Sequence, residues 1–450
     1  MAFKKDFTWG VASASFQIEG AAFEDGKGPS VWDMLCRKPG ASWRGQVGDV
    51  ACDHYRRYRE DIAIMKRLGV RASRFSVSWP RVLPAGVGAV NDKGLDFYDR
   101  LVDEYLAAGI EPWLTLFHWD YPLALYHRGG WLNRESADWF GEYARVLAER
   151  LGDRVSHWMT LNEPQCFLII GHEEGRHAPG DQLRFDEVVR AIHHTLLAHG
   201  RGVQALRAHA KTKPTVGVAM VASTRMPQTE TPADIDAARS AMFAYNPSIF
   251  QHNAWWFDPM FKGEYPAEGL ARFGPAAPDI QPGDMETIAQ PLDFLGVNIY
   301  NGQFIEASPE GPRYVDLPPG YPKSAYDNWP ITPTCLYWGP RFLHERYGLP
   351  IVITENGGCV VDTISLDGCV HDPQRTDYLH RHLLELRRAA DDGVPVDGYF
   401  YWSFADNFEW NLGDSIRMGL IFTDYPTQRR IPKDSAAWYS EVIRTNGNNL

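Results

Sequence analysis

Pro-Ile-Val-Ile-Thr-Glu-Asn-Gly, at residues 350–357, is the segment from which the fold can be worked out. Its β-branched apolar run, Ile351 to Ile353, is typical of a parallel strand that is buried on both faces. The turn residues Asn356 and Gly357 end the run, and Glu355 lies where the apolar residues stop. In parallel α/β folds the carboxyl ends of the strands carry the functional sites, so we expect this glutamate to face a cleft.

The same pattern, a helix face ended by a glycine and followed by an apolar strand, recurs along the chain. Eight strands are expected, at residues 7–12, 70–77, 110–117, 156–161, 215–221, 293–298, 351–354 and 398–403. Helices alternate with these strands, and no change in composition marks a linker. The sequence therefore predicts an α/β fold in which residues 1–450 form a single (β/α)8 TIM barrel, with long loops around the active-site mouth.

The composition excludes several classes of partner. The chain has 450 residues and a formal net charge of −12, and it contains no run of lysine or arginine, so no nucleic-acid partner is expected. The first residues form no apolar signal core, and no later segment is long and apolar enough to span a bilayer. We therefore expect a cytoplasmic protein with no membrane partner. The sequence does not predict its oligomeric state.

A metal site or a cofactor is not expected either. His172 and His177 resemble the zinc-binding His-x-x-x-His pattern, but that pattern needs its second histidine where Arg176 stands. Three further histidines lie in an expected helix and are interpreted as ordinary helix residues: His193, His194 and His199. No phosphate-binding glycine loop with a lysine is present.

Polar and aromatic side chains cluster where the expected strands end. In a barrel these positions converge on one mouth: Gln17, Arg74, His118, Asn162, Glu163, Asn298, Tyr300, Glu355, Trp402, Glu409 and Trp410. Two carboxylates beside aromatic rings suit glycoside hydrolysis, in which one carboxyl protonates the departing oxygen and the other attacks the anomeric carbon or activates a water. Tryptophan faces pack on the C–H faces of a sugar, and amides bind its hydroxyls.

The motifs around these residues resemble glycoside hydrolase family 1, the β-glucosidase and β-galactosidase family, over essentially the whole chain. Residues 160–164, Thr-Leu-Asn-Glu-Pro, resemble its acid/base motif, and residues 353–357, Ile-Thr-Glu-Asn-Gly, resemble its nucleophile motif. Further matches occur in the same order at residues 16–20, 74–79, 118–120, 177–180 and 402–410.

The resemblance implies a retaining β-glycosidase with Glu355 as nucleophile and Glu163 as acid and then base. Retention requires the two carboxyls to lie about 5–5.5 Å apart. Arg74 and Tyr300 match residues that hold and ionise the nucleophile, whereas Glu163 is expected to start protonated, with a raised pKa. The remaining matches imply substrate-binding roles for Gln17, His118, Trp119, Asn162, Asn298, Trp329, Trp402, Glu409 and Trp410.

The expected activity is the hydrolysis of terminal β-D-glucosyl residues of cello-oligosaccharides or of aryl and alkyl glucosides, with galactosides and fucosides as further substrates. His172 replaces a tyrosine that is frequent in the family, and Gln165 replaces an aromatic residue, so the leaving-group preference stays open. Transglycosylation is the nearer alternative, and a sugar-binding barrel without catalysis is the more distant one. The glutamate at position 163 counts against the second.

One branch of the family acts on sugar 6-phosphates, and this chain departs from its pattern. That branch replaces the glutamate of the Phe-Glu-Trp motif and places a lysine and a tyrosine shortly after it. Here Glu409 is kept, and Ile416 and Met418 stand at the later positions. A negative charge on Glu409 is expected to repel a phosphate.

Overall fold

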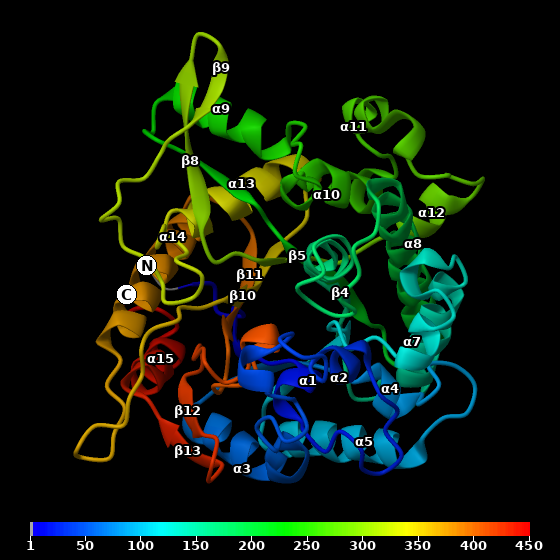
Figure 1. Cartoon of the computed structure of the whole chain (residues 1–450). Coiled ribbons are helices and arrows are strands. Elements are labelled where there is room, and N and C mark those ends of the chain that lie inside the picture. The colour runs from blue at the N-terminus through cyan, green and yellow to red at the C-terminus, as the bar shows by residue number, and fades with distance from the viewer. Residues whose placement is uncertain (1–2) are drawn as a thin grey trace.

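The computed structural model describes residues 3–450, and its centre is a closed barrel of parallel strands (Figure 1). The barrel order is β1-β11-β10-β7-β5-β4-β3-β2. Their bounds are β1 Thr8–Ala12, β2 Ala72–Ser76, β3 Glu111–Phe117, β4 His157–Asn162, β5 Thr215–Val221, β7 Leu295–Asn298, β10 Ile351–Asn356 and β11 Val396–Trp402. The eight strands match the eight expected ones, which confirms the predicted TIM barrel.

Amphipathic helices surround the barrel and cover its outer face (Figure 1). The long ones are α3 His54–Arg67, α5 Asp92–Ala107, α7 Ser136–Leu151, α8 Phe185–His209, α13 Cys335–Tyr347, α14 Pro373–Asp391 and α15 Asp434–Thr445. Between β5 and β7 lie α9 Pro232–Phe243, α10 Asn253–Lys262, α11 Ala267–Phe273 and α12 Asp284–Ile288. Short helices occupy the other loops: α1 Ser15–Ile18, α2 Val31–Leu35, α4 Trp79–Val82 and α6 Leu123–Tyr126.

The inside of the barrel has a separate apolar cluster. Trp113, Phe294 and Phe400 meet there, with the Trp113 ring centroid 5.5 Å from that of Phe294 and 4.9 Å from that of Phe400. Trp113 is the third residue of β3 and Phe294 directly precedes β7, so these two rings lie toward the amino-terminal end of the barrel, and Phe400 of β11 packs against Trp113. Polar side chains are left to the carboxyl-terminal end, where the mouth opens.

Two small sheets were not expected from the sequence. β6 Thr224–Pro227, β8 Gly302–Ser308 and β9 Gly311–Tyr314 form one, which projects from the barrel beside α9, and β12 Ile421–Asp424 pairs with β13 Arg429–Pro432 in the other (Figure 1). Both are built within loops that follow barrel strands, and their strands are too short to give a clear alternation in the sequence.

A buried ionic network supports the loop after β11. Lys433 bonds to Asp406 at 2.7 Å and to Asp362 at 2.5 Å, and Arg375 bonds to Asp362 at 2.7 Å and also to Asp372. All five of these side chains are completely buried. Because removing one partner of such a network leaves an uncompensated buried charge, the network holds the loop that contains Asp406 in one position.

Within residues 3–450, no helix combines the length and the apolar character needed to cross a bilayer. The cytoplasmic location stays a prediction.

Gly357 permits the close approach of β10 to β11, and replacing it should be costly. A Cβ at this position would overlap the backbone carbonyl oxygen of Trp402, so we expect Gly357→Ala to destabilise the protein by about 1–3 kcal/mol and to lower activity. Thermal unfolding at one scan rate measures the loss. Gly320→Ala is the control, since Gly320 is exposed and a Cβ there would meet nothing within 4 Å. Equal midpoints for the two variants would contradict the packing argument.

Candidate active site

A cavity of about 620 Å³ opens where the barrel strands end. This volume lies in the range of small-molecule sites. Most of the predicted site residues line it: His118, Trp119, Glu163, Asn298, Tyr300, Trp329, Glu355, Trp402, Glu409 and Trp410. The other three, Gln17, Arg74 and Asn162, are completely buried and hold the lining residues from behind. All the predicted side chains therefore belong to one constellation.

Glu355 is held by a cation and a phenol at the end of β10. The register of β10 shifts between Ile353 and Glu355 against β7, and this irregularity accompanies the turn of the side chain to the mouth. Arg74 donates from Nη1 to Glu355 Oε1 at 2.6 Å, and the Tyr300 hydroxyl donates to Oε2 at 2.7 Å. The carboxylate thus has a charge-assisted hydrogen bond to one oxygen and a neutral one to the other.

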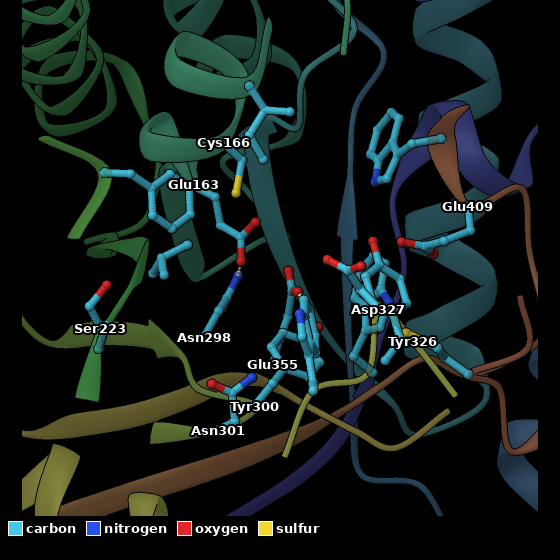
Figure 2. A pocket seen from close by; sticks show the side chains of 18 of the residues that line it. Glu163, Cys166, Ser223, Asn298, Tyr300, Asn301, Tyr326, Asp327, Glu355 and Glu409 are labelled. Carbon is cyan, nitrogen blue, oxygen red and sulfur yellow. Dashed lines mark hydrogen bonds between the residues drawn. The ribbon is translucent and has the colours of Figure 1, made fainter. Parts of the chain in front are cut away.

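Glu163 follows β4 in a left-handed backbone conformation, with φ 47°. Asn298 donates from Nδ2 to Glu163 Oε1 at 2.8 Å, and the buried thiol of Cys166 lies against the same carboxyl. Figure 2 shows Glu163 above Asn298 and Glu355 beyond it, so that the two carboxyls face one space. No cation pairs with Glu163 within the described chain, unlike Glu355.

The surroundings separate the two carboxyls electrostatically. Burial, followed by the charge of Glu355, raises the pKa of Glu163 to about 7. Burial also raises the pKa of Glu355, but Arg74 and Tyr300 act against this rise. We therefore place the shared proton on Glu163 and the negative charge on Glu355, as the sequence predicts for an acid and a nucleophile.

The hydrogen bonds around Asn162 fix the tautomer of His118. Asn162 Oδ1 accepts from Arg74 Nη2 at 2.6 Å, so its amide nitrogen is directed at His118 Nε2, 3.0 Å away. Burial lowers the pKa of His118 well below its usual value, and the ring is neutral with its proton on Nδ1. That N–H has no partner within residues 3–450, although it is buried. It is a free donor beside the cavity.

Glu409 lies at the other side of the cavity, and burial raises its pKa to about 8. Gln17 donates from Nε2 to Glu409 at 3.1 Å, and Tyr326 and Gln17 favour the charged form without cancelling the effect of burial. The neutral form of Glu409 is therefore favoured in the empty site. Burial thus acts against the negative charge that the sequence predicts for this group, and no cation in residues 3–450 compensates its loss of solvation.

Tryptophan rings form the walls between these groups. Trp119 stacks on Trp410 with 4.4 Å between ring centroids, and Trp402 stacks on His118 with 5.6 Å. The Trp119 indole N–H already donates to the Asn162 carbonyl oxygen at 2.9 Å. Trp119 therefore presents an apolar ring face to the cavity and has no free hydrogen-bond donor. Trp329 lies against Tyr300, with 5.3 Å between the ring centroids.

The backbone is left-handed at four non-glycine positions of the cavity wall, one of which is Asp327 with φ 47°. Trp119, Glu163 and Trp410 have φ values of 79°, 47° and 52°. A non-glycine residue in this region costs on the order of 1–3 kcal/mol and persists only where the surroundings enforce it.

The helix histidines, and the two residues that differ from the family pattern, make no hydrogen bond to Glu163 or Glu355 within residues 3–450. His172 bonds to Asp181 at 2.9 Å, and Gln165 donates to the Val221 carbonyl at 3.1 Å while its own oxygen stays unpartnered. His193, His194 and His199 are buried in α8, which agrees with their interpretation as helix residues. Among residues 3–450, no three His, Cys, Asp or Glu side chains form a group that could hold a metal ion.

Comparison with known proteins identifies the family. The sequence model of glycosyl hydrolase family 1 matches residues 1–448. The chain belongs to glycosyl hydrolase family 1. It is 45% identical to β-glucosidase A of Thermotoga maritima over 447 residues, which cover 99% of this chain and 98% of that one. The crystal structure of the T. maritima β-glucosidase in complex with glucoimidazole superimposes with a TM-score of 0.90 at 44% identity and covers 99% of both chains.

Another family 1 relative carries a different name. The aryl-phospho-β-D-glucosidase of Bacillus subtilis is 40% identical over 483 residues, with 100% of this chain and 98% of that one covered. The family therefore includes relatives of this chain that are named for phosphorylated and for unphosphorylated sugars.

Sequence reasoning missed part of this family 1 site. Tyr326 and Cys166 contact Glu409 and Glu163, and Asn407 accepts from Gln17 at 2.9 Å. Asn407 lies inside the motif at residues 402–410 and Cys166 lies two residues after the motif at residues 160–164, so the closeness of each to a glutamate along the chain is the signal that could have found them. Tyr326 lies in an irregular loop between β9 and α13 that has no periodic pattern, and nothing in the sequence indicates its place.

The coupling between the carboxyls can be measured directly. In Glu355→Gln, the pKa of Glu163 should fall below about 7, because the charge that raises it is gone while the burial remains. NMR titration of the Glu163 side chain with labelled glutamate gives the value. Glu409→Gln is the control, since Glu409 is largely protonated below its own pKa of about 8 and its replacement removes little charge. A similar or larger fall in the control would show that the coupling is assigned to the wrong pair.

Proposed function

We propose that this family 1 protein is a retaining β-glucosidase that acts on terminal, non-reducing β-D-glucosyl residues of cello-oligosaccharides or of aryl and alkyl glucosides. One observation carries the proposal: two carboxyls face one cavity, of which Glu355 is bound to a cation and Glu163 is not. The β-glucosidase names of the relatives support the choice of sugar. Galactosides and fucosides are proposed as further substrates, and residues 1–450 as one catalytic unit.

The reaction takes two displacements. Glu355 attacks the anomeric carbon while Glu163 gives its proton to the departing oxygen, and the leaving group departs as a neutral alcohol or phenol. The ester formed at Glu355 carries no charge, so one cause of the raised pKa of Glu163 disappears. Glu163 then accepts a proton from water, and the water oxygen displaces Glu355. Two inversions leave the sugar in its original β configuration.

The side chains around Glu163 and Glu355 bind the sugar. His118, Gln17 and Glu409 are assigned to the sugar hydroxyls. The unpartnered His118 Nδ1 and Gln17 Oε1 are covered in the empty site, and Glu409 accepts or donates because its pKa of about 8 allows both forms. Trp402 and Trp410 lie against the apolar faces of the sugar. Arg74, Asn162 and Asn298 hold the two carboxyls in register without being consumed.

Transglycosylation uses the same intermediate and differs only in the acceptor, so it accompanies hydrolysis at high sugar concentration. A barrel that only binds sugars is not favoured, because binding does not need an ionised and a protonated carboxyl next to each other. Hydrolysis of sugar 6-phosphates is the competing activity, since one relative is named for it. Around Glu409, however, the cavity is lined by Ile416, Met418 and Leu412, and no lysine or arginine pairs with Glu409 in residues 3–450.

Chemical rescue should separate the two roles. Glu355→Gly is expected to lose turnover of every substrate, and azide should restore it with an α-glycosyl azide as product, because azide attacks once from the vacated side. Glu163→Ala should still release dinitrophenolate, which needs no protonation, and azide should give the β-glycosyl azide after two inversions. NMR of the products distinguishes them.

Glu174→Ala, which removes an exposed carboxylate paired with Arg176, is the control and should neither lose activity nor respond to azide. Exchanged product configurations would mean that the roles of the two glutamates are reversed. Full activity in both cavity variants would refute the glycosidase assignment.

The preference of the enzyme for a glucoside over its 6-phosphate should follow from the lack of a lysine or arginine beside Glu409 in residues 3–450. We expect kcat/KM for p-nitrophenyl β-glucoside to exceed that for its 6-phosphate by at least 100-fold, because burying a phosphate beside Glu409 with no cation carries several kcal/mol of uncompensated desolvation. Initial rates with the two substrates at equal ionic strength test this. A preference for the phosphate would place the protein with its phospho-glucosidase relative instead.

A further inference from the structure

Arg225 is a buried arginine in the cavity wall that no carboxylate neutralises. It lies in β6, is 3% exposed and lines the cavity. Its Nε donates to the Tyr314 hydroxyl at 3.2 Å, and its Nη2 donates to Gln251 Oε1 at 2.9 Å. Nη1 makes no hydrogen bond within residues 3–450, and it is not among the fully covered polar atoms. This nitrogen therefore keeps some accessible surface, and Arg225 is one of the residues that line the cavity.

The other buried arginines show how unusual this is. In residues 3–450 each of them pairs with a carboxylate: Arg74 with Glu355, Arg81 with Glu19, Arg375 with Asp362 and Asp372, and Arg430 with Asp61. In the same part of the chain Arg225 forms no salt bridge with a carboxylate; its guanidinium carbon lies 5.3 Å from the centroid of the Tyr314 ring. A buried charge is costly unless it is paired, so the cavity holds a cation that lacks its anion.

The position of Arg225 assigns it to the leaving-group side. It follows β5 by way of Ser223, and β6 pairs with β8 so that Arg225 stands opposite Gln303. In Figure 2, Ser223 and Asn301 lie on one side of Glu163 and Glu355, and Glu409, Tyr326 and Asp327 lie on the other. Arg225 follows Ser223 by two residues in the chain, so we place the cation on the side of the cavity where Ser223 lies.

The surroundings of the open nitrogen suit a small planar anion. Gln251 accepts a hydrogen bond from Arg225, and Gln303 stands opposite Arg225 in the sheet. These two residues, Asn301 and Ser223 all line the cavity, and their amides and hydroxyl can bind the second oxygen or the ring substituents of such a group. The other cation that lines the cavity in the described chain, Arg176, is exposed and already paired with Glu174 at 2.5 Å. Arg225 is therefore the group that recognises the anion.

We propose that Arg225 binds a carboxylate carried by the leaving group, so that the preferred substrates of this enzyme are β-glucosides of acidic aglycones. The proposal rests on the proposed β-glucosidase function and specifies its substrate class. Without Arg225, an acidic aglycone would meet only repulsion from the carboxylates of the site and from the net charge of −12. With it, such an aglycone makes a charge-assisted hydrogen bond in a desolvated cavity.

The test compares leaving groups that differ only in charge. Substrates are the β-glucosides of 4-hydroxybenzoate and 3-hydroxybenzoate and of the two corresponding neutral hydroxybenzamides. The ratio of kcat/KM for acid over amide is measured in the wild-type protein, Arg225→Gln, Arg225→Lys and the control Arg176→Gln. Comparing each ratio with that of the wild type cancels the intrinsic reactivity of the leaving groups.

We expect Arg225→Gln to lower the ratio about tenfold or more for at least one ring position, since hydrogen bonds to charged groups contribute more than neutral ones. Arg225→Lys should keep part of the preference, and Arg176→Gln should keep the wild-type ratio. Added salt should lower the ratio wherever a cation stands at position 225, and should leave it unchanged in Arg225→Gln. A purely structural role for Arg225 would change both substrates alike and leave the ratio unchanged. That result, at both ring positions, overturns the proposal.

A second measurement needs no variant. Calorimetric titration of the wild-type protein with free 4-hydroxybenzoate and 3-hydroxybenzoate should show tighter binding than titration with the matching amides, and amides that bind equally well or better contradict the proposal. Hydrolysis of the neutral glucosides by the wild type supports the β-glucosidase function whichever way the ratios fall. If no β-glucoside is cleaved, that function fails, and the titrations still decide whether the cavity binds carboxylates.

Discussion

The ion pair between Arg74 and Glu355 is the interaction on which the site depends. Arg74 Nη1 and Glu355 Oε1 lie 2.6 Å apart, and the two side chains are 1% and 4% exposed. Water therefore solvates neither charge, and each charge depends on the other for its stabilisation. The two residues come from β2 and β10, which are not neighbours in the barrel, and only closure of the sheet brings them together. Because Asn162 accepts from the same guanidinium, the pair also fixes the amide that sets the His118 tautomer. One buried cation thus determines the protonation of several groups.

The rest of the architecture protects this arrangement from relaxing. The aromatic cluster of Trp113, Phe294 and Phe400 closes the barrel below, so the polar residues have one direction in which to point. On the far side, the network around Asp406 and Lys433 fixes the loop that leads to Glu409. Charged and polar groups stabilise a transition state best when they are in position before the reaction begins. The aromatic cluster and the ionic network hold these groups in position from two sides of the cavity.

The barrel and most of the site could be predicted from the sequence, for a physical reason. Strands buried on both faces leave short apolar runs, and Glu355 and Glu163 stand where such runs end, so position alone indicates their direction. The protonation of Glu409 could not be predicted in this way, because it depends on how completely distant segments exclude water. The same holds for Arg225, whose surroundings in β8, β9 and the 249–251 turn come together only in three dimensions. The sequence shows where a charged residue stands in the chain, but not which groups surround its side chain in the fold.

The left-handed backbone at Trp119, Glu163 and Trp410 has a consequence for how such a protein changes over generations. At each of these positions glycine would fit the conformation better than the residue that is present. Relieving this strain would gain about 1–3 kcal/mol, whereas truncating a buried tryptophan costs about 3–5 kcal/mol, so the stability of the barrel favours keeping the rings of Trp119 and Trp410 and would favour glycine only at Glu163. Of the three, Glu163 is thus the residue whose side chain the fold needs least, and its backbone strain is matched by no comparable gain in apolar packing.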